Sequence, residues 1–159
     1  MVSTSEQIME YFKDAGVVYQ HFPPEDEQFG FFDQQIENMA RTILLRIDNR
    51  YAILVSSVLE QVNYSRMRQV LGAGSVVPAT EEECRKLFPE CDSTALPVLD
   101  CLYEMRVYCS KKILSQSSIS FNPGTHDEVL SISIDDFVKL GRPVIGEFTD
   151  YPGDFQEIW

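Results

Sequence analysis

Hydrophobic and polar residues alternate with a period of two in two neighbouring segments of the chain. Isoleucine and phenylalanine alternate with serine in residues 119–121, and leucine and isoleucine alternate with serine in residues 130–134. A period of two places every second side chain on the same face of a strand. Pro123-Gly124 lies between the segments, and glycine accepts a positive φ without steric cost. The pattern predicts a β-hairpin with Gly124 in its turn.

Other segments extend this picture of short strands and amphipathic helices. The polar turn Asp48-Asn49-Arg50 separates two apolar runs, which predicts a second hairpin. Thr80 and Glu83 have the spacing of a capping box, as do Ser3 and Glu6, and both pairs stand at the start of a helical pattern. The predicted strands are 17–22, 41–47, 51–58, 75–77, 106–109, 119–121, 130–134 and 144–148, and the predicted helices begin at 3, 31, 63, 80 and 135.

Helices and strands alternate along the chain, but several strands are joined by hairpins. This order predicts an α/β or α+β fold, with a mixed, largely antiparallel sheet flanked by helices. We expect one domain over residues 1–150 and a tail over residues 151–159, because no linker composition or internal repeat interrupts the pattern.

The charge of the chain limits its partners. The 159 residues include 25 acidic and 13 basic side chains, and the formal net charge is −12. Strong non-specific binding to DNA or RNA depends on Lys and Arg contacts to phosphate, so this balance argues against it. A local basic pocket on an acidic body remains compatible with the sequence. With 44% hydrophobic residues, the chain has enough apolar side chains for a packed core.

The cysteines and histidines form no metal-binding motif. Four cysteines stand at positions 84, 91, 101 and 109, without a Cys-x-x-Cys pair and without a histidine cluster. We therefore expect neither a zinc site nor a cofactor, and we expect free thiols in a cytoplasmic protein. The polar N-terminal residues do not predict a signal peptide, and no segment is long and apolar enough to predict a membrane span.

Motifs of nucleophilic and nucleotide-dependent enzymes do not occur. The sequence has no Gly-x-Ser-x-Gly elbow and no phosphate-binding P-loop. Arg41 is a more specific candidate, because it opens the apolar strand that continues through Leu45. An arginine at the end of a strand can bind a phosphate or carboxylate in a pocket, although its spacing alone favours an ordinary surface residue.

Taken together, the segments resemble the YbaK and prolyl-tRNA-editing family of trans-acting aminoacyl-tRNA deacylases. The similarity runs over roughly residues 5–148. Each segment is weakly specific alone, and their common order along the chain carries the resemblance. These segments are Ala40-Arg41-Thr42-Ile43-Leu44-Leu45, 51–58, 67–72, 79–88, 88–97, 136–143 and the Phe121-Asn122-Pro123-Gly124-Thr125-His126 turn.

The resemblance implies a fold, a reaction and a site. The fold is a mixed-sheet domain, and the reaction is hydrolysis of the ester between a wrong amino acid and the 3′-terminal adenosine of tRNA. The implied partner is the acceptor end of tRNA. No protein nucleophile is required, because water attacks a carbonyl whose oxyanion is stabilised by amides and a cation. The implied catalytic residues are Arg41, Thr94 and Ala95, and the implied substrate-binding residues are Thr42, Ser57, Pro97, Gly124, Thr125 and His126.

The chain differs from the family pattern at the implied site. Arg41 stands where the family has lysine, and Thr94 stands where the loop glycine is expected. The family's Pro-Phe-Gly continuation is Pro97-Val98-Leu99 here. Arginine keeps the positive charge but does not release its proton in a protein, so it can act electrostatically and not as a proton shuttle.

Two functions remain open from the sequence. The chain is an editing-type deacylase with a divergent pocket, or it is a catalytically inactive relative that binds a ligand or a partner protein in the same pocket. The sequence does not identify the amino acid, the tRNA or the oligomeric state. Both functions require Arg41, residues 94–97 and Gly124 to converge on one cleft.

Overall fold

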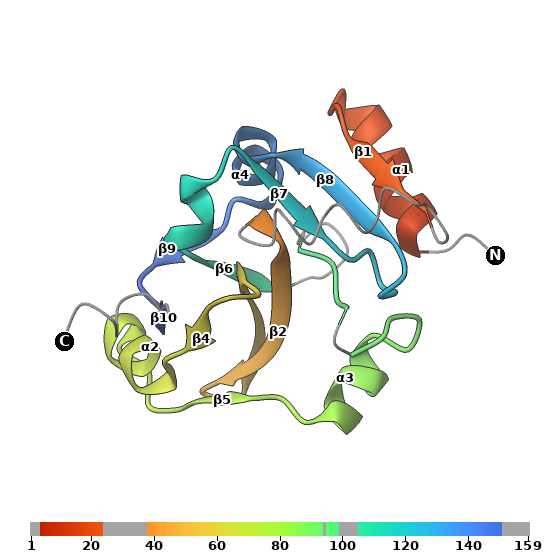
Figure 1. The fold of residues 1–159 in the computed structure, drawn as a ribbon. Helices are drawn as coiled ribbons and strands as arrows, with labels where there is room; N and C mark the ends of the chain where they lie inside the picture. Colours follow the sequence, from red (N-terminus) through yellow and green to blue (C-terminus); the bar gives the residue numbers. More distant parts are fainter. Residues whose placement is uncertain (1–3, 24–37, 94, 99–104, 151–159) are drawn as a thin grey trace.

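We describe the fold from a computed structural model, in which residues 4–23, 38–93, 95–98 and 105–150 are described. The predicted helix within 31–39, Thr94 and the tail 151–159 lie wholly or largely outside these residues. The strands of the described part form three sheets (Figure 1). The architecture is α+β with mixed, mostly antiparallel pairing, as the sequence predicted.

The largest sheet has five strands in the order β5-β2-β3-β6-β9. Its strands are β5 (Val76–Pro78), β2 (Ala40–Ile47), β3 (Arg50–Ser57), β6 (Arg106–Ser110) and β9 (Val144–Gly146). β2 pairs antiparallel with β3 and with β5, whereas β3–β6 and β6–β9 are parallel. The predicted hairpin is confirmed, with Asp48 and Asn49 at positive φ in its turn. The interior strand β3 is buried on both faces, which explains its nearly continuous apolar sequence.

Two smaller sheets complete the described strands. β1 (Gln20–Phe22), β8 (Val129–Ser133) and β7 (Ser118–Phe121) form an antiparallel sheet in which Phe121 lies opposite Leu130. This pairing confirms the hairpin predicted from the alternation in residues 119–134, and Gly124 in its turn has φ 105°. β10 (Thr149–Asp150) pairs with β4 (Gln61–Val62), and neither of these two-residue strands was predicted.

The helices begin largely where their caps predict. α2 (Tyr64–Leu71) is capped by Asn63, and α3 (Glu81–Leu87) has the complete Thr80–Glu83 capping box. α4 (Ile134–Gly141) follows Ser133, whose side chain accepts from the Asp136 N–H. α1 (Thr4–Ala15) begins beside the predicted cap Ser3, which is outside the described residues. The short 3₁₀ helix η3 (Lys112–Ser115) was not predicted.

The core has two parts, on opposite faces of the five-stranded sheet. Ile53 and Val55 of β3 belong to the larger part, with Ile8 and Phe12 of α1, whereas Leu54 between them belongs to the smaller part. This division follows from the alternation of side chains along a strand. The smaller part also contains Leu45, Met67, Val76 and Phe148. Figure 1 shows α1 and α2 at opposite ends of the domain.

Candidate functional site

A cavity of about 470 Å³ lies along β2, at the N-terminal end of α3. Four consecutive β2 residues, 41–44, contribute to its wall. The other described residues that line it are Pro78, Ala79, Glu81, Cys84 and Ser93. We call it the β2 cavity. It contains Arg41 and Thr42, two of the residues that the sequence singled out.

Among the described residues, β5 pairs with only part of the β2 edge that borders this cavity. The described pairing with β5 covers Leu45 to Ile47, and the Ala79 N–H donates to the Leu44 carbonyl over 2.9 Å. Main-chain groups two residues apart in a strand point in the same direction. The N–H and carbonyl of Thr42 therefore point to the same side as those of Leu44, beyond the end of β5. A ligand in the cavity has strand backbone within reach.

Two buried polar atoms of β2 have no hydrogen-bond partner among the described residues. They are Nε of Arg41 and Oγ1 of Thr42, and the Thr42 side chain is only 5% exposed. Both residues line the β2 cavity. Leaving a buried donor or acceptor unsatisfied costs about 1–3 kcal/mol, so such atoms are uncommon in a folded protein. Both atoms belong to residues of the cavity wall, but the side chains of consecutive strand residues point to opposite faces of the sheet, so each atom marks its own polar position beside the cavity.

The Arg41 side chain is held by a hydrogen bond to the main chain. Its Nη2 donates to the main-chain carbonyl of Glu60 over 2.5 Å. Burial raises the pKa of Tyr64 above its ordinary value, and the positive charge of Arg41 opposes this shift. Arg41 therefore lies close enough to α2 to interact with Tyr64 while it also lines the β2 cavity.

Glu60 is a buried carboxylate that holds this region together. Its side chain is 1% exposed and accepts bonds from the Ser57 N–H and the Ser110 hydroxyl, both over 2.8 Å to Oε1. Oε2 accepts from the Thr149 hydroxyl. These donors come from β3, β6 and β10, so one carboxylate connects three strands. Sequence reasoning did not identify Glu60, and its only local signal is an acidic residue soon after a buried strand.

The wall formed by α3 does not offer an ionised thiol. Burial, together with the carboxylates of Glu83 and Glu81, raises the pKa of Cys84 above its ordinary value. A neutral thiol is a poor nucleophile. The helix is attached to the sheet through the Tyr51 hydroxyl, which donates to Glu83.

The loop after α3 contacts the β7–β8 turn directly. The Gly124 N–H donates to the Ala95 carbonyl over 2.9 Å, and the Asp92 N–H donates to the Gly124 carbonyl over 2.8 Å. Gly124 thus lies beside the 92–95 loop, and Ser93 of this loop lines the β2 cavity with Arg41. Because the Gly124 N–H is already paired, oxyanion donors must come from other groups.

The other described residues that were predicted for the site are not among the described lining residues of this cavity; they are Ser57, Ala95, Pro97, Gly124, Thr125 and His126. Ala95 and Pro97 are buried, whereas Thr125 and His126 are exposed. Nε2 of His126 lies 3.6 Å from the Asp92 carboxylate. The Ser57 hydroxyl accepts a hydrogen bond from the Leu59 N–H over 3.1 Å, so it stabilises the turn after β3. Thr94 lies outside the described residues. The site roles of these residues stay predictions.

The described residues contain no group of three or more His, Cys, Asp or Glu side chains placed to hold a metal ion. A search of the described helices finds none with the length and apolar character needed to cross a membrane.

Comparison with protein families gives a match to the aminoacyl-tRNA editing domain over residues 26–140. This match covers most of the chain. The chain belongs to the aminoacyl-tRNA editing domain family. No curated protein matches it by sequence.

Solved structures share the editing-domain fold at low sequence identity. A candidate trans-editing enzyme for prolyl tRNA synthetase matches with a TM-score of 0.76 and 10% identity, over 94% of this chain and 99% of that one. A hypothetical protein matches with a TM-score of 0.77 and 14% identity, over 91% and 100% of the two chains. A candidate signal transduction protein from Marinobacter aquaeolei VT8 matches with a TM-score of 0.72 and 13% identity, over 90% of this chain and 30% of that one.

Proposed function

We propose that this editing-domain protein is an aminoacyl-tRNA deacylase, which hydrolyses the ester of a mischarged tRNA. The observation that carries the proposal is the cavity of about 470 Å³ along β2, whose described lining residues include Arg41 and Thr42, each with a buried polar atom that lacks a described partner. Small-molecule sites commonly measure about 300–1,000 Å³, so the volume suits the end of an aminoacylated tRNA. Membership of the editing family supplies the reaction class.

Arg41 and Thr42 have separate roles in this proposal. The ester carbonyl lies against Arg41, whose guanidinium stabilises the negative charge that develops on the carbonyl oxygen when water attacks. The Thr42 hydroxyl and the β2 edge beyond the end of β5 hold the substrate by hydrogen bonds. Arg41 stays protonated, so its contribution is electrostatic and the proton of the attacking water goes to substrate or solvent. The neutral Cys84 thiol leaves water as the nucleophile.

The test is hydrolysis of a panel of misacylated tRNAs by the wild-type chain, Arg41→Ala and Arg41→Lys. Removing one oxyanion-stabilising group costs roughly 10²–10³ in rate in well-studied enzymes. We expect Arg41→Ala to lose about this much, and Arg41→Lys to retain part of the rate. Equal rates for wild type and Arg41→Ala, or no hydrolysis of any substrate by the wild type, would contradict the proposal.

A catalytically inactive binding protein is the second candidate. The paired N–H of Gly124 favours it, because that amide is occupied and does not contribute to an oxyanion site. Arg41 in place of the family lysine also favours an inactive binding protein. In this case the wild-type chain binds an aminoacylated RNA end without hydrolysing it. Hydrolysis that appears only in Arg41→Lys would identify an enzyme that lost its activity at this position.

A further inference from the structure

A second cavity, of about 650 Å³, lies between α2, η3 and the segment that connects β9 with β10. The described residues that line it are Arg66, Lys111, Lys112, Ser115, Glu147 and Thr149. We call it the basic cavity. Neither the family resemblance nor the proposed reaction assigns a role to it.

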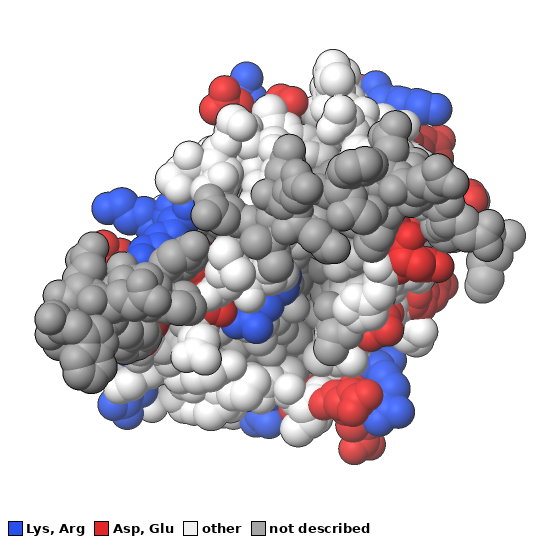
Figure 2. Space-filling view, viewed as in Figure 1, with Lys and Arg blue, Asp and Glu red and all other residues white. Residues whose placement is uncertain are grey.

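Its charge is opposite to that of the whole chain. Three cationic residues and one anionic residue stand among its described lining residues, whereas the chain has 13 basic and 25 acidic residues. The β2 cavity, by contrast, has one cationic and one anionic residue among its described lining residues, Arg41 and Glu81. Figure 2 shows basic side chains on the side of the molecule where β9 lies, whereas acidic side chains gather toward α3.

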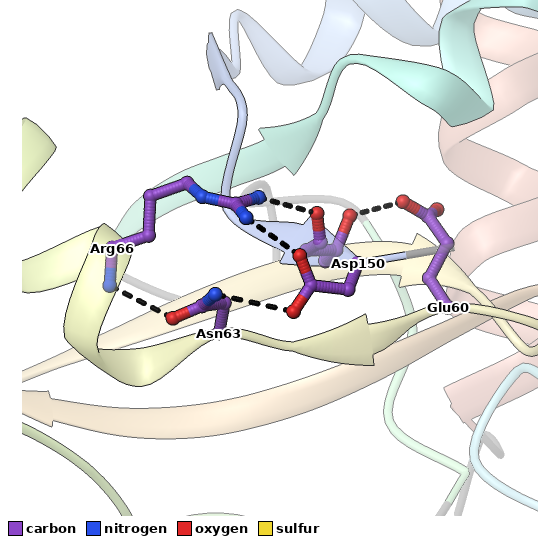
Figure 3. Close-up of polar contacts among 5 residues, drawn as sticks. Glu60, Asn63, Arg66 and Asp150 are labelled. Atoms are coloured by element: carbon purple, nitrogen blue, oxygen red, sulfur yellow. Dashed lines mark hydrogen bonds and ion pairs between the residues drawn. The ribbon is translucent and has the colours of Figure 1, made fainter. Parts of the chain in front are cut away.

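The guanidinium of Arg66 is held in a fixed position at this cavity (Figure 3). Nη1 donates to the Thr149 carbonyl over 2.9 Å, and Nη2 donates to the Asp150 carboxylate over 2.6 Å. The other Asp150 oxygen accepts from the Asn63 amide over 3.1 Å. Asp150 offsets part of the Arg66 charge, but the fixed planar group loses little side-chain freedom when a further acceptor binds.

Lys111 and Lys112 provide charge that is exposed to solvent. Both side chains are exposed, at the start of η3. The main chain there is fixed, because the Lys111 N–H donates to the Gly146 carbonyl over 3.0 Å. The exposed positive charges of Lys111 and Lys112 add to that of the fixed Arg66 guanidinium, and a phosphate can contact these groups together. Glu147 is also exposed, so its carboxylate can stay in water when an anion binds.

We propose that the basic cavity binds a phosphate group, either of an RNA chain or of a small phosphorylated molecule. The RNA source has support from the relation between the two cavities. Arg41 of the β2 cavity donates to Glu60, and Thr149 of the basic cavity donates to the same residue. Glu60 therefore connects a wall residue of each cavity, and an RNA chain that runs from one cavity to the other is part of the proposal. This RNA source rests on the proposed function, whereas phosphate binding itself does not.

The test compares two double variants with the same change in charge. Lys111→Glu/Lys112→Glu alters the basic cavity, and Lys13→Glu/Lys139→Glu alters exposed lysines on α1 and α4. Binding is measured by fluorescence anisotropy with a labelled single-stranded RNA that ends in CCA, and by calorimetry with inorganic phosphate and pyrophosphate. Thermal unfolding checks that both variants are folded.

We expect the cavity variant to lose about tenfold or more in affinity for at least one probe, while the control variant loses clearly less. For RNA, the slope of log K against log salt should fall by about 1.4, because each phosphate contact with a single strand contributes about 0.7. Loss of RNA binding identifies an RNA phosphate, and loss of phosphate binding alone identifies a small phosphorylated ligand. Equal losses in the two variants, or unchanged binding of every probe, would overturn the proposal.

A phosphate-free substrate separates this inference from the deacylase proposal. If both hold, aminoacyl-adenosine is hydrolysed equally by the wild type and the cavity variant, because it has no phosphate to lose. If the wild type hydrolyses no ester yet binds RNA through Lys111 and Lys112, the deacylase proposal fails and the basic cavity stands. If the wild type hydrolyses tRNA esters and the lysine substitutions change the binding of no probe, the deacylase proposal stands and the basic-cavity proposal fails.

Discussion

The two cavities of this protein present different polar groups. In the β2 cavity, polar atoms such as Thr42 Oγ1 are buried and lack a described partner, and the charges of Arg41 and Glu81 balance. In the basic cavity, the lysines are exposed, and Arg66 already makes bonds to Thr149 and Asp150. A buried, unsatisfied group recognises a ligand at short range, whereas exposed like charges attract an anion over roughly a Debye length.

The difference suits two separate roles, recognition at short range in the β2 cavity and attraction of an anion in the basic cavity. Strong hydrogen bonds in a cavity with little water favour discrimination and charge stabilisation during a reaction. Exposed lysines contribute to capture, and their effect weakens as salt rises. Under the proposed function, such a local positive region would offset the net charge of −12, which repels an RNA chain elsewhere.

The largest expected effect comes from Glu60, which accepts bonds from Arg41 of the β2 cavity and from Thr149 of the basic cavity. Glu60→Ala removes the acceptor of the Ser57 N–H and the Ser110 and Thr149 hydroxyls, so we expect about 3 kcal/mol or more of lost stability. Chemical denaturation measures this change. Glu60→Gln keeps the shape and one acceptor oxygen, so it should lose less. A cost below about 1 kcal/mol for Glu60→Ala would show that the two cavities do not depend on this carboxylate.

A smaller expected effect tests whether the buried Thr42 hydroxyl binds a ligand or is an ordinary buried polar group. Thr42→Val removes the unsatisfied hydroxyl with little change of shape, so we expect stability to rise by about 1 kcal/mol and ester hydrolysis to fall. Ser56→Ala is the matched control. Its hydroxyl is also buried without a described partner, but Ser56 is not among the described lining residues of the β2 cavity.

The control should gain stability without losing activity. Thermal unfolding and the rate of hydrolysis are measured on the same preparations of both variants. If Thr42→Val and Ser56→Ala affect hydrolysis equally, the Thr42 hydroxyl does not contact the substrate.

The smallest effect concerns the α3 wall of the β2 cavity at low pH. Bonds from the Thr80 N–H and the Tyr51 hydroxyl lower the pKa of Glu83 from its ordinary value of 4.5. Because the folded pKa is lower than the unfolded one, this stabilisation is complete above about pH 4.5 and is lost as pH falls through the folded pKa. We therefore expect the stability of Glu83→Gln to fall less than that of the wild type as the pH drops below about 4.5.

Melting temperatures of the wild type and Glu83→Gln between pH 7 and pH 3 provide the measurement. Glu82→Gln is the control, because Glu82 is an exposed neighbour in the same turn of α3. Identical pH profiles for the wild type and Glu83→Gln would mean that the Glu83 bonds do not hold this wall.

Much of the fold followed from local patterns. Alternation predicted both hairpins, and the caps at Asn63 and Thr80 predicted where α2 and α3 begin. Two strands were missed because β4 and β10 have two residues each, which is too short for any period to appear. Predicted strands also proved longer than observed, as in β9, which ends at Gly146 and not at Phe148.

The candidate site was predicted only in part. Arg41 was identified from its place at the start of a strand, and the resemblance added Thr42. Glu60, Ser93 and Cys84 were missed because each is an unremarkable residue in the sequence. Their importance depends on which distant segments lie beside them.

The sequence by itself determined most of the secondary structure and the class of fold, because alternation, caps and turn residues act over a few positions, and the order of these segments indicated the family. Only the tertiary structure decided where the chemistry lies. Glu60 and Thr149 are 89 positions apart, and parallel pairing of β3 with β6 brings Ser110 to the same carboxylate. No local pattern encodes such pairings, because they depend on how the whole sheet packs around its core.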